Sequence, residues 1–201
     1  MRLLLSAFVP ELGPLAEHPP AGWETATVGV GAVTAAAATA RLLAERRPEA
    51  VLFLGTCGRY DDRLQLFESI WASEAIATSL AEVRGEAYRP GLEQSRWAST
   101  LAGTLPRQMV DALSRQAVAV PPAITNTREG AALLAPVAPV EHLELTGVFA
   151  ACAAAGVPCG GALVVVNDVG PDAQAQWKAN HAEGSRRLVD RLRAAGLFEG
   201  V

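Results

Sequence analysis

The sequence contains little cysteine. Cys57, Cys152 and Cys159 are the only three among 201 residues, and their spacing is irregular. Three unevenly spaced cysteines cannot build a disulfide framework, and no CxxC pair is present to bind a metal ion. We therefore expect a cytoplasmic protein in a reducing compartment, with no metal ion and no other cofactor.

Long apolar runs and an excess of basic charge are also missing. The apolar run at residues 1–9 is far shorter than the roughly 18–20 residues of a membrane-spanning helix, and no small-residue cleavage site follows it. The formal net charge is −4, and lysine and arginine are scattered along the chain. No basic patch is therefore predicted, which excludes nucleic acid and an anionic membrane as expected partners.

What the sequence does contain is apolar. Half of its residues are hydrophobic, which is enough to bury one sizeable core and too little for two enzyme domains with a linker. We expect a single domain over residues 1–201. Short apolar runs alternate with alanine-rich stretches, and this alternation is typical of a β-sheet with helices on both faces. The predicted fold class is three-layer α/β/α.

Hydrophobic periodicity locates the main elements. Strands are expected at residues 2–8, 25–30, 50–54, 67–76, 117–125 and 163–166, and helices at 33–45, 147–155 and 177–195, the last beginning as a loop. Residues 95–115 have helical spacing, with a break at Pro106. The segment Gly55-Thr56-Cys57-Gly58 is expected to form a loop after a buried strand, where glycine lets a ligand approach the backbone.

Four segments carry a recognisable pattern. They are VGVGAVTAAAATARLLAERRPEAVLFLGTCG from residue 28, AFVPE at 7–11, VEHLELTG at 140–147 and VVVNDVGP at 164–171. Together they resemble the nucleoside phosphorylase and nucleosidase superfamily, in the same order along nearly the whole chain. The segments VGPDAQAQW at 169–177 and ITNT at 124–127 most closely resemble futalosine hydrolase. The resemblance implies a central mixed sheet that is partly barrel-like, a purine nucleoside substrate and a homo-oligomer.

The resemblance also assigns roles to individual residues. Glu11 stands where methylthioadenosine-type nucleosidases have their catalytic carboxylate, and Glu144 stands where a glutamate binds the ribose hydroxyls. Asn167 fits the position that binds the base, and Asp168 is the rival for that position; both join Glu11 in the catalytic set. The substrate-binding set contains Glu144, Leu143 beside the ribose, Gly55, Thr56, Thr125 and Trp177.

These residue types suit cleavage of an N-glycosidic bond. The ribose develops oxocarbenium character and the departing purine gains negative charge, so polar groups are needed on both sides of the sugar. Glu11 would activate water, and Glu144 would fix the sugar through charge-assisted hydrogen bonds. The Asn167 amide offers both a donor and an acceptor, which matches a 6-oxopurine. The predicted function is hydrolysis of futalosine or a related 6-oxopurine nucleoside, with release of hypoxanthine, in menaquinone biosynthesis by resemblance.

Other functions stay open at this point. Phosphorylases of this superfamily often carry an arginine where Phe53 stands, and a buried phenylalanine cannot neutralise phosphate. A phosphorylase remains the alternative, because Thr56 and its neighbouring N–H groups, with Arg59, can still contribute to an anion site. His142 and Leu143 depart from the family pattern, so a non-catalytic nucleoside-binding homologue, or one with a closed pocket, is a further alternative.

The acidic residues and Asn167 also have purely structural explanations. Glu11 could cap a turn or a helix. Glu144 precedes an apolar helix and could complement its dipole. Asn167 and Asp168 could form a turn, because both side chains readily bond their own backbone.

The remaining candidates are interpreted more simply. Trp177 could belong to the core or to a lid instead of holding the base. His142 and His181 have no partners at ligand spacing and are interpreted as surface or supporting residues. Cys57 is interpreted as a small buried filler.

Overall fold

Eight β-strands form one mixed sheet in the computed structural model, which describes residues 1–101 and 111–197. The strands are β1 (Arg2–Ser6), β2 (Trp23–Thr27), β3 (Val51–Arg59), β4 (Ser69–Ala77), β5 (Arg96–Ala98), β6 (Ser114–Val120), β7 (Val140–Glu141) and β8 (Cys159–Asp168). The sheet order is β2-β1-β3-β7-β6-β4-β5, and β8 pairs with both β3 and β4. Because of this double pairing, β8 closes β3, β7, β6 and β4 into a barrel.

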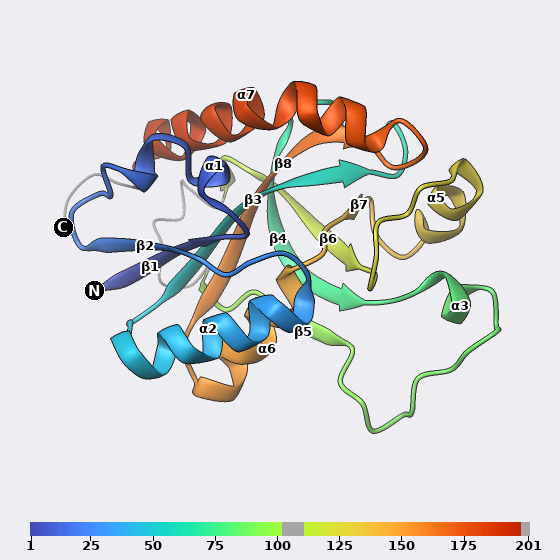
Figure 1. Ribbon diagram of the computed structural model, residues 1–201, viewed down its shortest axis with the longest axis horizontal. Coiled ribbons are helices and arrows are strands. Elements are labelled where there is room, and N and C mark those ends of the chain that lie inside the picture. The colour runs from blue at the N-terminus through green and yellow to red at the C-terminus, as the bar shows by residue number, and fades with distance from the viewer. Residues whose placement is uncertain (102–110, 198–201) are drawn as a thin grey trace.

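Helices cover both faces of the sheet (Figure 1). On one face, α2 (Ala32–Arg46) packs against α6 (Leu145–Ala155). On the other, α7 (Ala173–Ala194) lies along β8, beside α1 (Val9–Leu12) and the 3₁₀ helix η1 (Gly13–Ala16). The short helices α3 (Leu80–Val83) and α5 (Arg128–Leu134) contact each other away from these layers. The expected three-layer α/β/α fold with a mixed, partly barrel-like sheet is confirmed.

The two central strands are apolar because both of their faces are covered. All of β3 except Arg59 and all of β8 except Asp168 are buried, and strands in this situation need continuous apolar runs instead of alternation. β3 and β8 run parallel, so their carboxyl ends lie at the same edge of the sheet, with Gly58 opposite Asn167. That edge is where the polar side chains of both strands emerge.

The segment 55–58 is not the loop that was predicted. It continues β3, with Gly55 opposite Leu163, and the register shifts between Cys57 and Gly58. The prediction was wrong because β8 supplies the pairing partner, and local sequence does not reveal it. The glycine at 58 still has a role, since a Cβ there would lie 2.7 Å from Nδ2 of Asn167.

Three further predictions need correction or limits. Arg96–Ala98 forms β5 against β4 where a helix was predicted, and Pro106 lies outside the described residues. The helix α7 already begins at Ala173, so Trp177 lies in the helix and not in a loop. β6 ends at Val120, before two prolines that have no N–H to donate to a ladder.

A close contact between α2 and α6 positions the site. A Cβ on Gly147 would lie only 2.0 Å from the carbonyl oxygen of Ala32, so the two helix backbones touch at a point that admits glycine alone. The residue before α2, Gly31, has φ 89°, a conformation that favours glycine. The contact brings the start of α2 next to Glu144, which immediately precedes α6.

In the described ranges, no helix combines the length and the apolar character that crossing a bilayer requires.

Candidate active site

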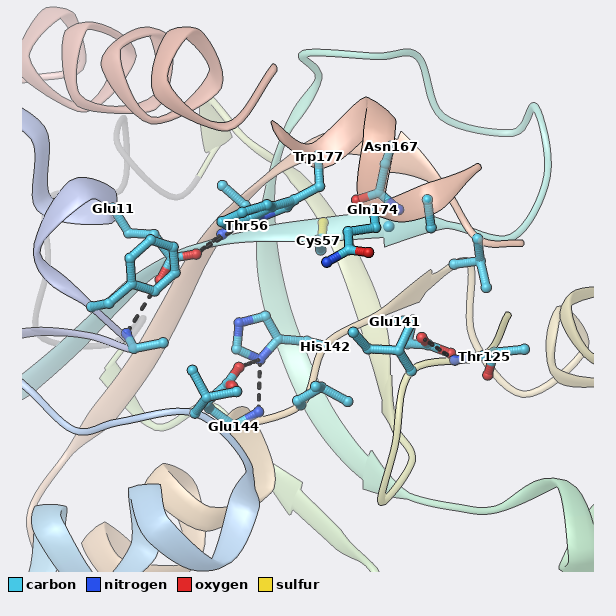
Figure 2. Close-up of a pocket in the computed structure, with 18 residues that line it drawn as sticks. Glu11, Thr56, Cys57, Thr125, Glu141, His142, Glu144, Asn167, Gln174 and Trp177 are labelled. Atoms are coloured by element: carbon cyan, nitrogen blue, oxygen red, sulfur yellow. Dashed lines mark hydrogen bonds and ion pairs between the residues drawn. The ribbon is translucent and has the colours of Figure 1, made fainter. Parts of the chain in front are cut away.

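A cavity of about 450 Å³ opens at the carboxyl ends of β3 and β8. Most of its lining is apolar, and polar groups enter from several elements (Figure 2). The predicted site residues that line it are Glu11, Thr56, Thr125, Leu143, Glu144, Asn167 and Trp177. Two other predicted site residues do not line the cavity. Gly55 lies beneath His142, and Asp168 is not among the lining residues. One cavity therefore gathers residues from both ends of the sequence.

Glu11 is held by residues far from it in sequence. It lies in α1, directly after β1, and is only 3% exposed. Its Oε1 accepts hydrogen bonds from the backbone N–H (2.9 Å) and the hydroxyl (2.7 Å) of Thr56, and its Oε2 accepts from the N–H of Ala7 (3.2 Å). Two of the three donors belong to β3, so the side chain does more than cap a local turn.

Burial sets the acidity of Glu11. It raises the pKa of the carboxyl to about 7, against the lowering effect of the Thr56 hydrogen bonds, and the nearby charge of Glu144 acts in the same direction as burial. A carboxyl with a pKa near neutrality can both take and return a proton at physiological pH, which suits a general base.

Trp177 is linked to Glu11 through Thr56. Its indole N–H donates to Oγ1 of Thr56 (3.1 Å), and that hydroxyl donates to Glu11. One face of the indole stacks on His181, with ring centroids 4.3 Å apart, and Phe8 lies 5.6 Å away at a tilt. Trp177 therefore forms a fixed wall of the cavity from α7.

Glu144 enters the cavity from the opposite helix layer. Its Oε1 accepts a hydrogen bond from the N–H of Gly31 at 2.8 Å, and its Oε2 lies 3.3 Å from Nδ1 of His142. The side chain makes no capping hydrogen bond to α6. Its orientation therefore depends on Gly31 and His142, although its charge still lies near the start of α6.

Asn167 and Asp168 separate at the end of β8. Asn167 is 8% exposed and lines the cavity, and its Nδ2 donates to the carbonyl of Asp168 (3.0 Å), which leaves Oδ1 and one amide hydrogen for a ligand. Asp168 pairs with Arg59 (2.6 Å) and accepts from Gln176 (3.3 Å). The predicted catalytic use of Asp168 is not supported by this placement, because its carboxylate is engaged outside the cavity lining.

Sequence reasoning missed several cavity residues. Glu141 is a third buried carboxylate, which accepts from the N–H of Thr125 (3.0 Å) and from the hydroxyl of Tyr60 (2.9 Å). It was present in the VEHLE motif, but its partners come from other strands and loops. Gln174 points into the cavity from the first turn of α7 (Figure 2), and no pattern indicated it.

His142 and Cys57 also line the cavity. His142 is only 4% exposed, so its interpretation as a surface residue was wrong, although a supporting role is compatible with its contacts. Cys57 is buried as expected, and burial raises the pKa of its thiol far above the ordinary value. A thiol that stays protonated is a poor nucleophile.

The charges of the cavity have one sign. Glu11, Glu141 and Glu144 line it, and no lysine or arginine does so among the described residues. Nor do these residues contain three acids, histidines or cysteines grouped closely enough to hold a metal ion. The arrangement can orient water and hydroxyl groups, and it opposes the entry of an anion.

No protein-family model and no curated protein sequence matches the chain. Solved structures match in fold. The native futalosine hydrolase of Helicobacter pylori strain 26695 has a TM-score of 0.82 at 15% identity, over 97% of this chain and 96% of that chain. The 5′-methylthioadenosine/S-adenosylhomocysteine nucleosidase of the same species, with butyl-thio-DADMe-Immucillin-A, has a TM-score of 0.82 at 16% identity, over 97% of both chains.

A third match is the MTA/SAH nucleosidase of Streptococcus pneumoniae in complex with 8-aminoadenine, with a TM-score of 0.82 at 14% identity, over 98% of this chain and 99% of that chain. Identities this low show a shared fold and nothing finer. The chain has the fold of the nucleoside phosphorylase and nucleosidase superfamily.

Proposed function

We propose that the protein is a nucleosidase that hydrolyses the N-glycosidic bond of a purine nucleoside. The observation that carries the proposal is the pair of carboxylates facing one cavity from opposite helix layers, Glu11 from the α1 side and Glu144 beside α2 and α6. Glu11 would activate the attacking water, and Glu144 would hold the ribose hydroxyls. The fold of known nucleosidases supports this assignment.

The sign of the cavity charge favours water over phosphate as the attacking group. Three carboxylates and no cationic side chain line the cavity in the described part of the chain. Phe53, at the position where phosphorylases often carry arginine, is fully buried against the ring of His142. A phosphate dianion would meet only like charges there. Phosphorolysis is therefore the weaker alternative.

We further propose a 6-oxopurine nucleoside, with futalosine as the leading candidate. The free amide hydrogen and Oδ1 of Asn167 can pair with O6 and with a ring N–H of such a base. Incubation with futalosine, inosine, adenosine and methylthioadenosine, followed by identification of the released base, tests this choice. Release of hypoxanthine is expected, and a strong preference for adenine release would contradict it.

The base preference is expected to follow residue 167. Asn167→Asp should shift the preference toward 6-amino purines, because an ionised carboxylate can only accept hydrogen bonds and would face O6 with a like-signed oxygen. Discrimination should be large, since a wrong edge leaves buried groups unpaired. The measurement is the ratio of kcat/KM for inosine and adenosine in both proteins.

Asp168→Ala provides the matched comparison. We expect it to lose the contact with Arg59 and to keep most of its activity, whereas Asn167→Ala should lose activity. The opposite pattern, with Asp168→Ala inactive and Asn167→Ala near wild type, would transfer the base-binding role to Asp168 and remove the basis of the 6-oxopurine proposal.

The pH dependence of turnover is expected to report Glu11. Only the ionised carboxylate can take a proton from water, so kcat/KM should fall about tenfold per pH unit below about pH 7 and level off above it. The profile of kcat/KM belongs to the free enzyme, in which this pKa applies. A flat profile from about pH 5 to about pH 8 would remove Glu11 from the role of general base.

A further inference from the structure

His142 is a closely packed polar side chain of the cavity. Its backbone N–H donates to the carbonyl of Ala119 in β6 (3.0 Å), and its ring stands edge-on to Phe53, with centroids 5.2 Å apart at 85°. A Cβ on Gly55 would lie 3.0 Å from Nε2, so the imidazole rests directly on the β3 backbone. The ring has little freedom to turn away.

Two groups of Glu144 compete for one nitrogen of this ring. The backbone N–H of Glu144 lies 3.1 Å from Nδ1, and the carboxylate Oε2 lies 3.3 Å from the same atom (Figure 2). An N–H can only donate, so Nδ1 must be unprotonated to accept it. A proton on Nδ1 would instead be donated to Oε2. The two hydrogen bonds therefore require different states of Nδ1: the first needs it without a proton, and the second needs it with a proton, as in the protonated ring.

We propose that His142 is a positioning residue that controls whether Glu144 can bind the ribose. When neutral with its proton on Nε2, His142 accepts the backbone N–H of Glu144 at Nδ1 and leaves Oε2 of Glu144 free for a ribose hydroxyl. When protonated, it pairs with Oε2 and withdraws that oxygen from the sugar. Oε1 stays with Gly31 in both states, so Oε2 is the oxygen that matters. This inference rests on the proposed function, because it assumes a ribose in the cavity.

The surroundings of His142 favour the neutral state. The charged groups that share its cavity are Glu144 on its own segment, Glu141 next to it and Glu11 of α1. From β3 it meets Phe53 and Gly55, and from β6 a backbone carbonyl, none of which titrates. Burial lowers the pKa of His142 below its ordinary value, and the charge of Glu144 opposes that shift only in part. Ribose affinity should therefore be high at neutral pH and fall as the solution becomes acidic.

The experiment measures equilibrium binding in the Glu11→Gln background, which slows turnover and removes the titration of Glu11. Inosine is the probe, and 2′,3′-dideoxyinosine, which has the same base and lacks the 2′- and 3′-hydroxyl groups, is the ligand control. Because the pKa of His142 lies below its ordinary value, we expect the affinity for inosine to stay constant from about pH 8 to about pH 7 and to fall as the pH decreases further to about 5.5, by up to about tenfold, the equivalent of one hydrogen bond to a charged group. The affinity for the dideoxy compound should be nearly constant.

Variants of His142 separate positioning from simple packing. His142→Asn keeps an acceptor for the Glu144 N–H but cannot be protonated, so it should bind inosine at neutral pH and lose the pH dependence. His142→Leu lacks the acceptor and should bind weakly at every pH. His18→Asn, at an exposed histidine, is the matched control and should keep the dependence.

The outcomes distinguish this inference from the proposed function. Inosine binding with the same pH dependence in His142→Asn would overturn the inference and leave the nucleosidase proposal intact. If wild type neither binds nor cleaves inosine, adenosine or futalosine, the proposed function fails and the inference fails with it. Thermal unfolding of each variant shows whether the protein is folded under the conditions of the binding measurements.

Discussion

Glu11→Gln is expected to reduce kcat by about 10²–10⁴-fold while the protein remains folded. Glutamine has nearly the same shape, and its amide oxygen can still accept from Thr56, but it has no basic lone pair with which to activate water. The measurement is single-turnover release of the purine base, together with thermal unfolding of the same sample.

Losing the charge of Glu11 should not lower the stability of the folded protein. Burial raises the folded-state pKa of Glu11 from 4.5 to about 7, so the folded protein binds a proton more tightly than the unfolded chain does. Ionisation of Glu11 therefore destabilises the fold progressively as the pH rises from about 4.5 through 7, and glutamine removes that effect. Glu17→Gln, at an exposed position shortly after α1, is the matched control. Turnover of Glu11→Gln within a few-fold of wild type would show that another group activates water.

Glu144→Ala is expected to weaken binding of the ribose and to slow turnover. A hydrogen bond to a charged group contributes roughly 1.5–3 kcal/mol, which corresponds to about 10- to 150-fold in kcat/KM. The loss should be much smaller for 2′-deoxyribosides, because they already lack one of the hydroxyls. The ratio of kcat/KM for inosine and 2′-deoxyinosine, in wild type and variant, is the measurement.

Glu144→Gln refines that test. Its amide oxygen can still accept from Gly31, so the start of α2 should stay in place while the charge is lost. If Glu144→Ala and Glu144→Gln both slow turnover, the lost charge is the cause. If only Glu144→Ala slows turnover, the cause is displacement of the turn at Gly31. Equal activity of wild type on ribosides and 2′-deoxyribosides would argue against any contact between Glu144 and the 2′-hydroxyl.

Much of the fold could be predicted because its strongest signals are local. The apolar runs of β3 and β8 and the alanine-rich α2 reflect burial on both faces and close helix packing, and each is readable from neighbouring residues. The strand character of residues 55–58 could not be predicted. It depends on pairing with β8, which lies more than a hundred residues away in sequence.

The same distinction between local signals and long-range contacts applies to the candidate site. Glu11, Glu144 and Asn167 stand at the ends of regular elements, so the motifs alone indicated them, and all three line the cavity. The contacts that orient them are long-range: Thr56 for Glu11, and Gly31 for Glu144. Individual sequence segments do not reveal such pairings, and the burial of His142 against Phe53 and the engagement of Asp168 by Arg59 were missed for that reason.

The most direct test of hydrolysis is to identify the sugar product. Purified protein is incubated with inosine and with futalosine, with and without inorganic phosphate, and the sugar released beside hypoxanthine is analysed. Because carboxylates alone supply the charge of the described cavity lining, the free sugar should form at the same rate in both conditions. Base release that requires phosphate and yields a sugar 1-phosphate would contradict the account.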